Sequence, residues 1–348
     1  MSYARDCIAR IAGYVPGEQP QGKPLVKLNT NENPYPPSPK VFEAASRLDI
    51  ARLRLYPEPS SRIIREAASR AFGVPADSIL CGNGSDDLLT IALRTFVGEG
   101  DALAFSEPSY SLYPVLADLQ GARKNPVRLT ESFDFPDDAA QQAGDAKLFL
   151  LACPNAPTGN LFDKGKIRAL CQDFRGVVWI DEAYADFAER NCLDLIQEFP
   201  NVIVSRTLSK SFSLAGLRLG IAFASEPLVF EMNKVRDSYN VDMITQHLAA
   251  AALDDIEYMR DNAAKICATR DWLSKELAAR GAKVLPSSAN FIFVEPKHPA
   301  QEIFSELRTR GFLVRYFNLP RISQFIRITI GRPDEMQAFL KAFEEADC

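Results

Sequence analysis

Short apolar runs alternate with amphipathic segments through the middle of the chain. The run at 148–152 is apolar throughout, as buried parallel strands are, whereas 86–96 places Leu88, Ala92 and Phe96 on one face of a helix. Strands that alternate with helices predict a mostly parallel sheet with helices on both of its faces. The same pattern predicts further strands at 78–81, 102–105, 177–180, 202–204 and 219–224, and further helices at 60–72, 113–119 and 164–171.

The pattern changes near residue 245, which predicts a smaller α+β domain over 245–348 after a large α/β domain over 41–244. The first 40 residues are rich in Pro, Gly and Asn and predict an arm with one short helix, packed on the small domain or on a partner subunit. The small domain is expected to contain a long helical stretch to residue 280, a strand at 290–294, a helix at 299–310, strands at 312–316 and 325–330, and a helix at 333–346.

Composition excludes several classes of protein. The 348 residues carry a net charge of −5, which gives no basic footprint for nucleic acid, and no apolar run is long enough to span a membrane. The N-terminus lacks the apolar core of a signal peptide, so we expect a cytoplasmic protein. With two histidines and no Cys-x-x-Cys pair among seven cysteines, we expect no metal site.

Polar motifs follow nearly every predicted strand, and in open α/β sheets ligands bind beyond the carboxyl ends of the strands. After the strand at 78–81, Gly84, Ser85 and Asp86 open a helix whose free N–H groups can bind an anion, although a plain helix cap explains them equally well. After the strand at 102–105, Tyr110 is a candidate for stacking on an aromatic ligand or for core packing.

The next two strands end in Asn155 and in Asp181 with Tyr184. Two prolines beside Asn155 rigidify a loop that presents its amide, or simply make a turn. A carboxylate directly after a buried strand requires a cation, and a protonated pyridine nitrogen is a suitable one; a salt bridge or Mg²⁺ are the alternatives. Tyr184 could form a hydrogen bond to a hydroxyl group on the same pyridine ring, beside Asn155.

Lys210 follows the apolar run at 202–204 and lies among hydroxyl groups. A lysine in such a place can form a Schiff base with an aldehyde, and Ser209 and Arg218 can hold a phosphate nearby. An aldehyde and a phosphate together describe pyridoxal 5'-phosphate (PLP). In the second domain, Arg327 lies on the opposite face of its strand from three isoleucines and can bind a carboxylate or phosphate or form an internal salt bridge; Arg315 is a second candidate.

With these motifs, the chain resembles the fold type I PLP-dependent aminotransferases, and within them the histidinol-phosphate aminotransferase family. The resemblance runs nearly end to end and includes the segments at 28–34, 55–58, 82–86, 154–159, 181–184 and 206–220. It implies that Lys210 is the Schiff-base lysine and general base, and that Asp181 pairs with the pyridine nitrogen. Asn155 and Tyr184 would bond the ring oxygen, and Tyr110 would stack on the ring.

The resemblance also implies the anion contacts. The phosphate of the cofactor would be held by the group Gly84, Ser85, Asp86, Thr207, Ser209 and Arg218, joined by Tyr56 of the partner in a homodimer. Arg327 would take the carboxylate of glutamate, and Arg315, Tyr35 and Asn33 are candidate contacts to the substrate.

The reaction that the resemblance implies is a ping-pong transfer of an amino group. Glutamate would donate its amine, which would then pass to imidazole acetol phosphate and give L-histidinol phosphate. Transamination of phenylalanine or tyrosine is the first alternative. A second, less favoured alternative is an enzyme of the same scaffold that decarboxylates a phosphorylated amino acid.

Overall fold

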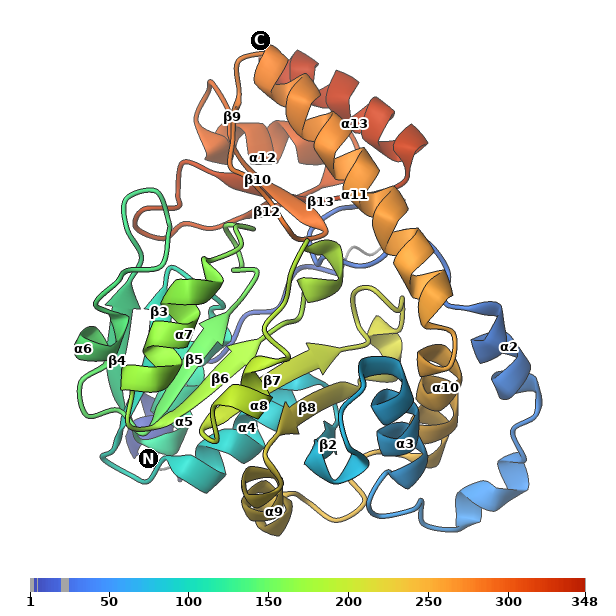
Figure 1. Cartoon of the computed structure of the whole chain (residues 1–348). Coiled ribbons are helices and arrows are strands. Elements are labelled where there is room, and N and C mark those ends of the chain that lie inside the picture. Colours follow the sequence, from blue (N-terminus) through green and yellow to red (C-terminus); the bar gives the residue numbers. More distant parts are fainter. Residues whose placement is uncertain (1–2, 5, 20–24, 348) are drawn as a thin grey trace.

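The computed structural model describes residues 3–4, 6–19 and 25–347. At its centre is a seven-stranded sheet with the strand order β2-β8-β7-β6-β5-β3-β4 (Figure 1). β8 is antiparallel to both of its neighbours, and every other pairing in this sheet is parallel, which confirms the predicted fold class. The strands are β2 (Ile79–Gly82), β3 (Ala102–Glu107), β4 (Arg123–Arg128), β5 (Leu148–Ala152), β6 (Val177–Asp181), β7 (Val202–Thr207) and β8 (Gly220–Ala224).

Helices cover both faces of the sheet, and alternate side chains of the central strands enter two separate cores. On β5, Leu148 and Leu150 pack with α4, α5 and α9, whereas Phe149 and Leu151 pack with α6, α7 and α8. Burial on both faces explains why this strand is apolar at every position. The helices are α4 (Ser85–Phe96), α5 (Leu112–Gln120), α6 (Ala139–Ala143), α7 (Lys164–Asp173), α8 (Leu195–Glu198) and α9 (Glu226–Val235).

A four-stranded antiparallel sheet of order β12-β13-β10-β9 forms a second layer of structure, above the large sheet in Figure 1. Three helices pack against it: α11 (Ile256–Ala279), α12 (Ala300–Thr309) and α13 (Pro333–Ala346). Its strands are β9 (Lys283–Val284), β10 (Phe291–Glu295), β12 (Arg315–Tyr316) and β13 (Ile326–Thr329).

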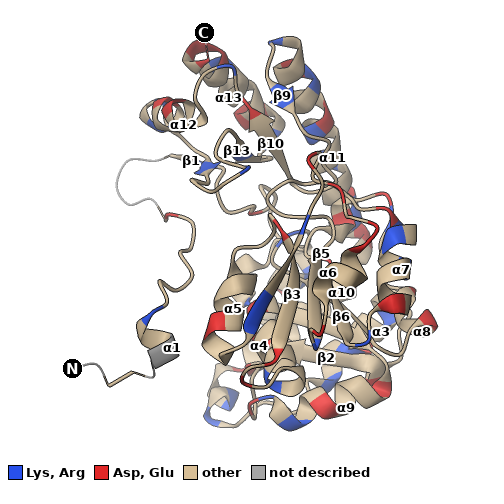
Figure 2. Ribbon diagram, turned by 90° about the vertical axis from the view of Figure 1, so that its left-hand side faces the viewer, with Lys and Arg blue, Asp and Glu red and all other residues tan. Residues whose placement is uncertain are grey.

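The N-terminal segment touches both layers. Its helix α1 (Asp6–Ala9) lies beside α5 (Figure 2), and its strand β1 (Val26–Lys27) pairs in parallel with β11 (Phe312–Leu313). The following helix, α2 (Pro39–Ser46), packs on α10 (Met243–Leu253), which also packs on α3 (Arg62–Phe72). The division at 40/41 and 244/245 remains a prediction.

Several elements differ from the sequence predictions. The long helical stretch expected over 245–280 is two helices, α10 and α11, separated at Asp254 and Asp255, where Ser38 Oγ donates to the Asp255 carboxylate. Strands β1, β4 and β9 and helices α2, α6, α8 and α9 were not predicted, and the single strand expected at 312–316 is two strands, β11 and β12. β4 is an edge strand with exposed Arg123, Lys124 and Arg128, so it lacks the apolar pattern of its neighbours. No helix in the described ranges is long and apolar enough to cross a membrane.

Candidate active site

A cavity of about 300 Å³ lies at the carboxyl ends of the parallel strands. Its wall combines the N-terminal segment, loops that follow strands of the large sheet, and the region of β12 and β13. Eleven of the residues singled out from the sequence line it: Ser85, Asp86, Tyr110, Asp181, Tyr184, Thr207, Ser209, Lys210, Arg218, Arg315 and Arg327. Segments far apart in the chain therefore meet at one site.

Lys210 lies in the loop after β7 and points towards the N-terminal segment. Its Nζ donates to the backbone oxygen of Thr30 at 2.9 Å. Burial, together with the positive charges of Arg327 and Arg218, lowers the pKa of Lys210 to about 8. The lower pKa increases the fraction of neutral amine near neutral pH, which is the form that a nucleophile or a general base requires.

Asp181 ends β6 and is buried. Its Oδ2 accepts the hydroxyl hydrogen of Tyr113 at 3.0 Å, and its Oδ1 accepts the N–H of Ala183 at 3.2 Å and the hydroxyl of Ser205 at 3.5 Å. Burial raises the pKa of Asp181 to about 6, against the opposing effect of the Tyr113 bond. These partners include no cation, so the carboxylate is poised to pair with a cationic group of a ligand.

The start of α4 forms an anion cradle with Arg218 and Ser209. Arg218 Nη1 lies 3.3 Å from Ser209 Oγ, and the buried Ser85 Oγ has no hydrogen-bond partner in the described structure. Gly84 has φ +86°, and a Cβ there would lie 2.5 Å from Arg218 Nη2. A helix N-terminus, an unsatisfied hydroxyl and a guanidinium in close contact suit a phosphate group.

Arg327 and Arg315 form a second cationic end of the cavity. Arg327 Nη2 donates to the backbone oxygen of Asn29 at 2.8 Å, and its buried Nε has no partner within the described residues. Both guanidinium groups pack over the ring of Phe317, at 5.4 Å from its centroid. Burial lowers the pKa of Arg327. The described structure shows no internal salt bridge to either arginine, so the alternative considered from the sequence is not the one found.

Two aromatic residues also line the cavity. Tyr184 accepts a hydrogen bond from Asn31 Nδ2 at 2.9 Å, and burial raises the pKa of its hydroxyl. The Tyr110 ring makes edge contacts with Tyr113 and Tyr14 at centroid distances of 5.5 and 5.9 Å. Stacking of Tyr110 on a ligand ring and a hydrogen bond from Tyr184 to it remain predictions.

Five of the singled-out residues do not line the cavity: Gly84, Asn155, Asn33, Tyr35 and Tyr56. Asn155 is fully buried, with its amide bonded to Ser109, Pro108 and Thr158. Asn33 Nδ2 instead donates to the backbone oxygens of Lys210 and Ser211, at 3.0 Å each.

Tyr35 and Tyr56 lie farther from the cavity. Tyr35 packs under Lys265 and Arg332. Tyr56 is 80 % exposed and stacks on Tyr239 at 4.6 Å. Neither contact involves a cavity residue, so their predicted roles are not visible within one subunit.

Sequence reasoning missed several cavity residues. Tyr14, Thr30 and Asn31 belong to a segment without periodicity, and Phe317 and Ile322 to a loop of the small sheet. Tyr113 reaches Asp181 across 68 residues of chain, and no local sequence pattern predicted this contact. Within the described ranges, no group of three or more His, Cys, Asp or Glu side chains could hold a metal ion.

A mostly parallel sheet with a lysine, a buried carboxylate and a phosphate-type cradle at its strand ends defines an enzyme of amino-group transfer. A family model described as "Aminotransferase class I and II" matches residues 23–343. The chain belongs to this aminotransferase family, as its resemblance indicated.

Individual relatives are similar over the whole chain. A histidinol-phosphate aminotransferase of Geobacter sp. (strain M21) is 46% identical over 343 residues, covering 98% of this chain and 97% of that protein. One from Synechocystis sp. is 44% identical and covers 97% of this chain and 96% of that protein. The crystal structure of a histidinol-phosphate aminotransferase from Sinorhizobium meliloti, in complex with pyridoxal-5'-phosphate, superposes with a TM-score of 0.90 at 25% identity, covering 99% of this chain and 98% of that one.

Proposed function

We propose that this protein is a histidinol-phosphate aminotransferase that uses PLP. It would transfer an amino group between L-glutamate/2-oxoglutarate and imidazole acetol phosphate/L-histidinol phosphate. The observation that carries the proposal is that one cavity is lined by both cationic sites and by Lys210, whose amine is influenced by the charges of Arg327 and Arg218. One site suits the phosphate of the cofactor, and Arg315 and Arg327 suit either a substrate carboxylate or a phosphate ester.

The residues present fit PLP. The cradle of Ser85, Ser209 and Arg218 would hold its phosphate, and Asp181 would pair with its ring nitrogen. When bound, PLP supplies an electron sink that stabilises negative charge on the α carbon of the substrate. Tyr113, through its bond to Asp181, would keep the carboxylate oriented towards the ring.

The protein's own groups would move the proton. With a pKa near 8, Lys210 Nζ would accept the proton of the substrate α carbon and deliver it to the C4' carbon of the cofactor. Arg327 would fix the substrate carboxylate, and the apolar wall of Phe317 and Ile322 would exclude water around it.

The decisive experiment is titration of the PLP-loaded protein with L-histidinol phosphate and, separately, with L-phenylalanine. The visible absorption of the bound cofactor should change at a far lower concentration of L-histidinol phosphate. Preference for phenylalanine would move the enzyme to aromatic amino acids. Release of carbon dioxide instead of formation of an oxo acid would indicate a decarboxylase.

We further propose a cytoplasmic homodimer. Tyr56 is highly exposed, and Phe42, Ile50, Leu53 and Leu55 nearby in the chain are also at least 47 % exposed. Exposed apolar side chains gathered in this way suit a contact with a second copy. In that dimer, Tyr56 would reach the phosphate cradle of the partner.

A further inference from the structure

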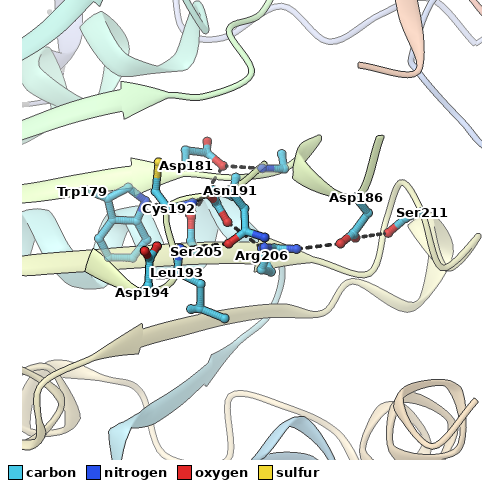
Figure 3. Close-up of polar contacts among 12 residues, drawn as sticks. Trp179, Asp181, Asp186, Asn191, Cys192, Leu193, Asp194, Ser205, Arg206 and Ser211 are labelled. Atoms are coloured by element: carbon cyan, nitrogen blue, oxygen red, sulfur yellow. Dashed lines mark hydrogen bonds and ion pairs between the residues drawn. The ribbon is translucent and has the colours of Figure 1, made fainter. Parts of the chain in front are cut away.

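A buried network of hydrogen-bonded charged groups reaches Ser211, the residue that follows Lys210 (Figure 3). None of the residue roles proposed above involves this network. Arg206, near the end of β7, donates from Nε to Glu182 Oε2 at 2.8 Å and from Nη1 to Asp186 Oδ1 at 2.6 Å. Ser211 Oγ donates to the other Asp186 oxygen, Oδ2, at 2.5 Å. These hydrogen bonds therefore join the ends of β6 and β7 to the residue that follows Lys210.

The three charged side chains of this network are shielded from solvent. The side chains of Arg206, Glu182 and Asp186 are 6, 1 and 14 % exposed. Burial raises the pKa of Glu182; burial lowers that of Arg206, but the two carboxylates raise it to a greater extent. Desolvation offsets much of the attraction in such a buried triad, so its clearest effect is to restrict the side chains to one arrangement.

The backbone around Lys210 is held from two sides. On one side Asn33 Nδ2 donates to the backbone oxygens of both Lys210 and Ser211. On the other side Ser211, which is buried, is bonded to Asp186. A loop fixed at both faces leaves Lys210 only the freedom of its own side chain.

We propose that Asp186, held by Arg206 and bonded to Ser211, is a positioning residue that fixes the backbone of Lys210 so that Nζ reaches the reacting carbon. This inference rests on the proposed function, because it assigns the bond to Ser211 a role in catalysis. Misplacement of a reacting group by about 1 Å can cost about 100-fold in rate. Asp186 itself touches neither the cavity nor the reacting atoms.

The test compares Ser211→Ala and Asp186→Asn with Ser38→Ala. Ser38 lines the same small hollow as Ser211, and its hydroxyl also donates to a partly buried carboxylate, that of Asp255. None of its described hydrogen bonds reaches Asp186 or Lys210, so it controls for local loosening. Ser211→Thr keeps the hydroxyl and serves as the rescue variant. Thermal unfolding establishes that each variant is folded.

Two readouts are needed. Hydrogen exchange of the backbone amides at 209–213, in the cofactor-free protein, should rise about tenfold in Ser211→Ala and Asp186→Asn, since a hydrogen bond to a charged group is lost. In the loaded enzyme, kcat should fall about tenfold or more while KM for L-glutamate stays within about twofold. Ser38→Ala and Ser211→Thr should change neither quantity.

Unchanged exchange at 209–213 in Ser211→Ala would overturn the inference. A higher KM at constant kcat would also do so, because it would show a binding contact instead of a positioned lysine. If the unaltered protein fails to transaminate any amino acid, the proposed function fails, and the exchange comparison then decides separately whether Asp186 holds the loop. If Asp186→Asn does not fold, Ser211→Ala alone decides.

Discussion

At the scale of single residues, the site holds two titrating groups away from their ordinary pKa values. Burial lowers the pKa of Lys210 to about 8 and raises that of Asp181 to about 6. The two shifts favour a neutral amine and disfavour an isolated carboxylate, which are the conditions for amine chemistry beside a cationic ring. Each shift has a consequence that can be measured in the cofactor-free protein.

The shift of Lys210 predicts a pH-dependent reactivity. In the cofactor-free protein, acetylation of Lys210 should rise with pH through a midpoint near 8, because only the neutral amine reacts. Arg327→Met should raise this midpoint, since removal of a nearby positive charge favours the ammonium form. Mass spectrometry of peptides measures the modification, with half-exposed Lys234 as the internal reference. A Lys210 profile that coincides with that of Lys234 would contradict the prediction.

The shift of Asp181 predicts a stability that falls as pH rises. A carboxyl whose pKa is higher in the folded state stabilises that state most at pH values below the unfolded pKa of about 3.8. This contribution is lost as pH rises through the folded pKa of about 6. Asp181→Asn should therefore raise the free energy of unfolding of the cofactor-free protein by about 1–3 kcal/mol at neutral pH, yet abolish transamination.

Urea unfolding at neutral pH and near pH 4 measures this effect. The gain from Asp181→Asn should be confined to neutral pH, where the wild-type carboxyl is charged. Asp194→Asn, a change of half-exposed Asp194, is the control. An equal gain at both pH values would show that charge burial is not its cause.

At the scale of elements, the start of α4 is the helix terminus that forms the anion cradle. Gly84→Ala would place a Cβ 2.5 Å from Arg218 Nη2, so the guanidinium must move out of the cradle. Affinity for PLP should fall at least about tenfold, because a charge-assisted contact to the phosphate is lost. Equilibrium titration of the cofactor-free protein with PLP, followed by absorbance, measures it.

Gly100→Ala is the matched control. Gly100 has φ +82°, close to that of Gly84, but a Cβ there meets no atom within 4 Å. Both changes carry backbone strain, so both should lower stability by about 1–3 kcal/mol, and only Gly84→Ala should weaken cofactor binding. Ser85→Ala removes the unpartnered hydroxyl without strain and should also weaken it. Equal affinities in Gly84→Ala and Gly100→Ala would contradict the cradle.

A comparison of the elements shows which helices and strands could be predicted from the sequence. Strands such as β5 were predictable because both faces are buried and the apolar run is unbroken, whereas edge strand β4 shows mainly polar side chains. The two aspartates at 254 and 255 are the only local sign of the break between α10 and α11, and the surrounding helical composition masked it. At the break, Asp255 accepts a hydrogen bond from Ser38, more than 200 residues away in the chain.

The candidate site likewise contains some residues that could be predicted from the sequence and others that could not. Lys210 and Asp181 were predictable because Asp181 ends β6 and Lys210 comes three residues after the end of β7, and the topology gathers strand ends at one edge. Tyr113, Thr30 and Asn31 carry no such signal, because their partners are fixed by tertiary packing of segments that lie far apart in the chain.

At the scale of the whole molecule, one subunit holds nearly every group of the proposed mechanism, and Tyr56 is the exception. It lies on the surface, stacked on Tyr239, and its neighbours in the chain include exposed apolar side chains. A two-fold dimer places the same patch on both subunits against each other. If Tyr56 then completes the site of the partner, each active site contains residues from two chains.

Mixing two impaired variants tests this sharing. Lys210→Ala lacks the reacting amine and should lose at least about 1000-fold in kcat. Tyr56→Ala keeps Lys210 but would weaken cofactor binding in the partner subunit. In a hybrid dimer, the Tyr56→Ala subunit would contribute an intact Lys210, and the Lys210→Ala subunit would supply the intact Tyr56 to that same site.

One site of each hybrid is therefore complete. After unfolding and refolding of an equal mixture, random pairing makes half of the dimers hybrids, so activity should recover to about a quarter of that of the unaltered enzyme. Refolding of each variant alone is the control, and sedimentation establishes that dimers have formed. Activity that stays at the sum of the two separate variants, in a sample shown to contain dimers, would mean that Tyr56 serves its own subunit or none.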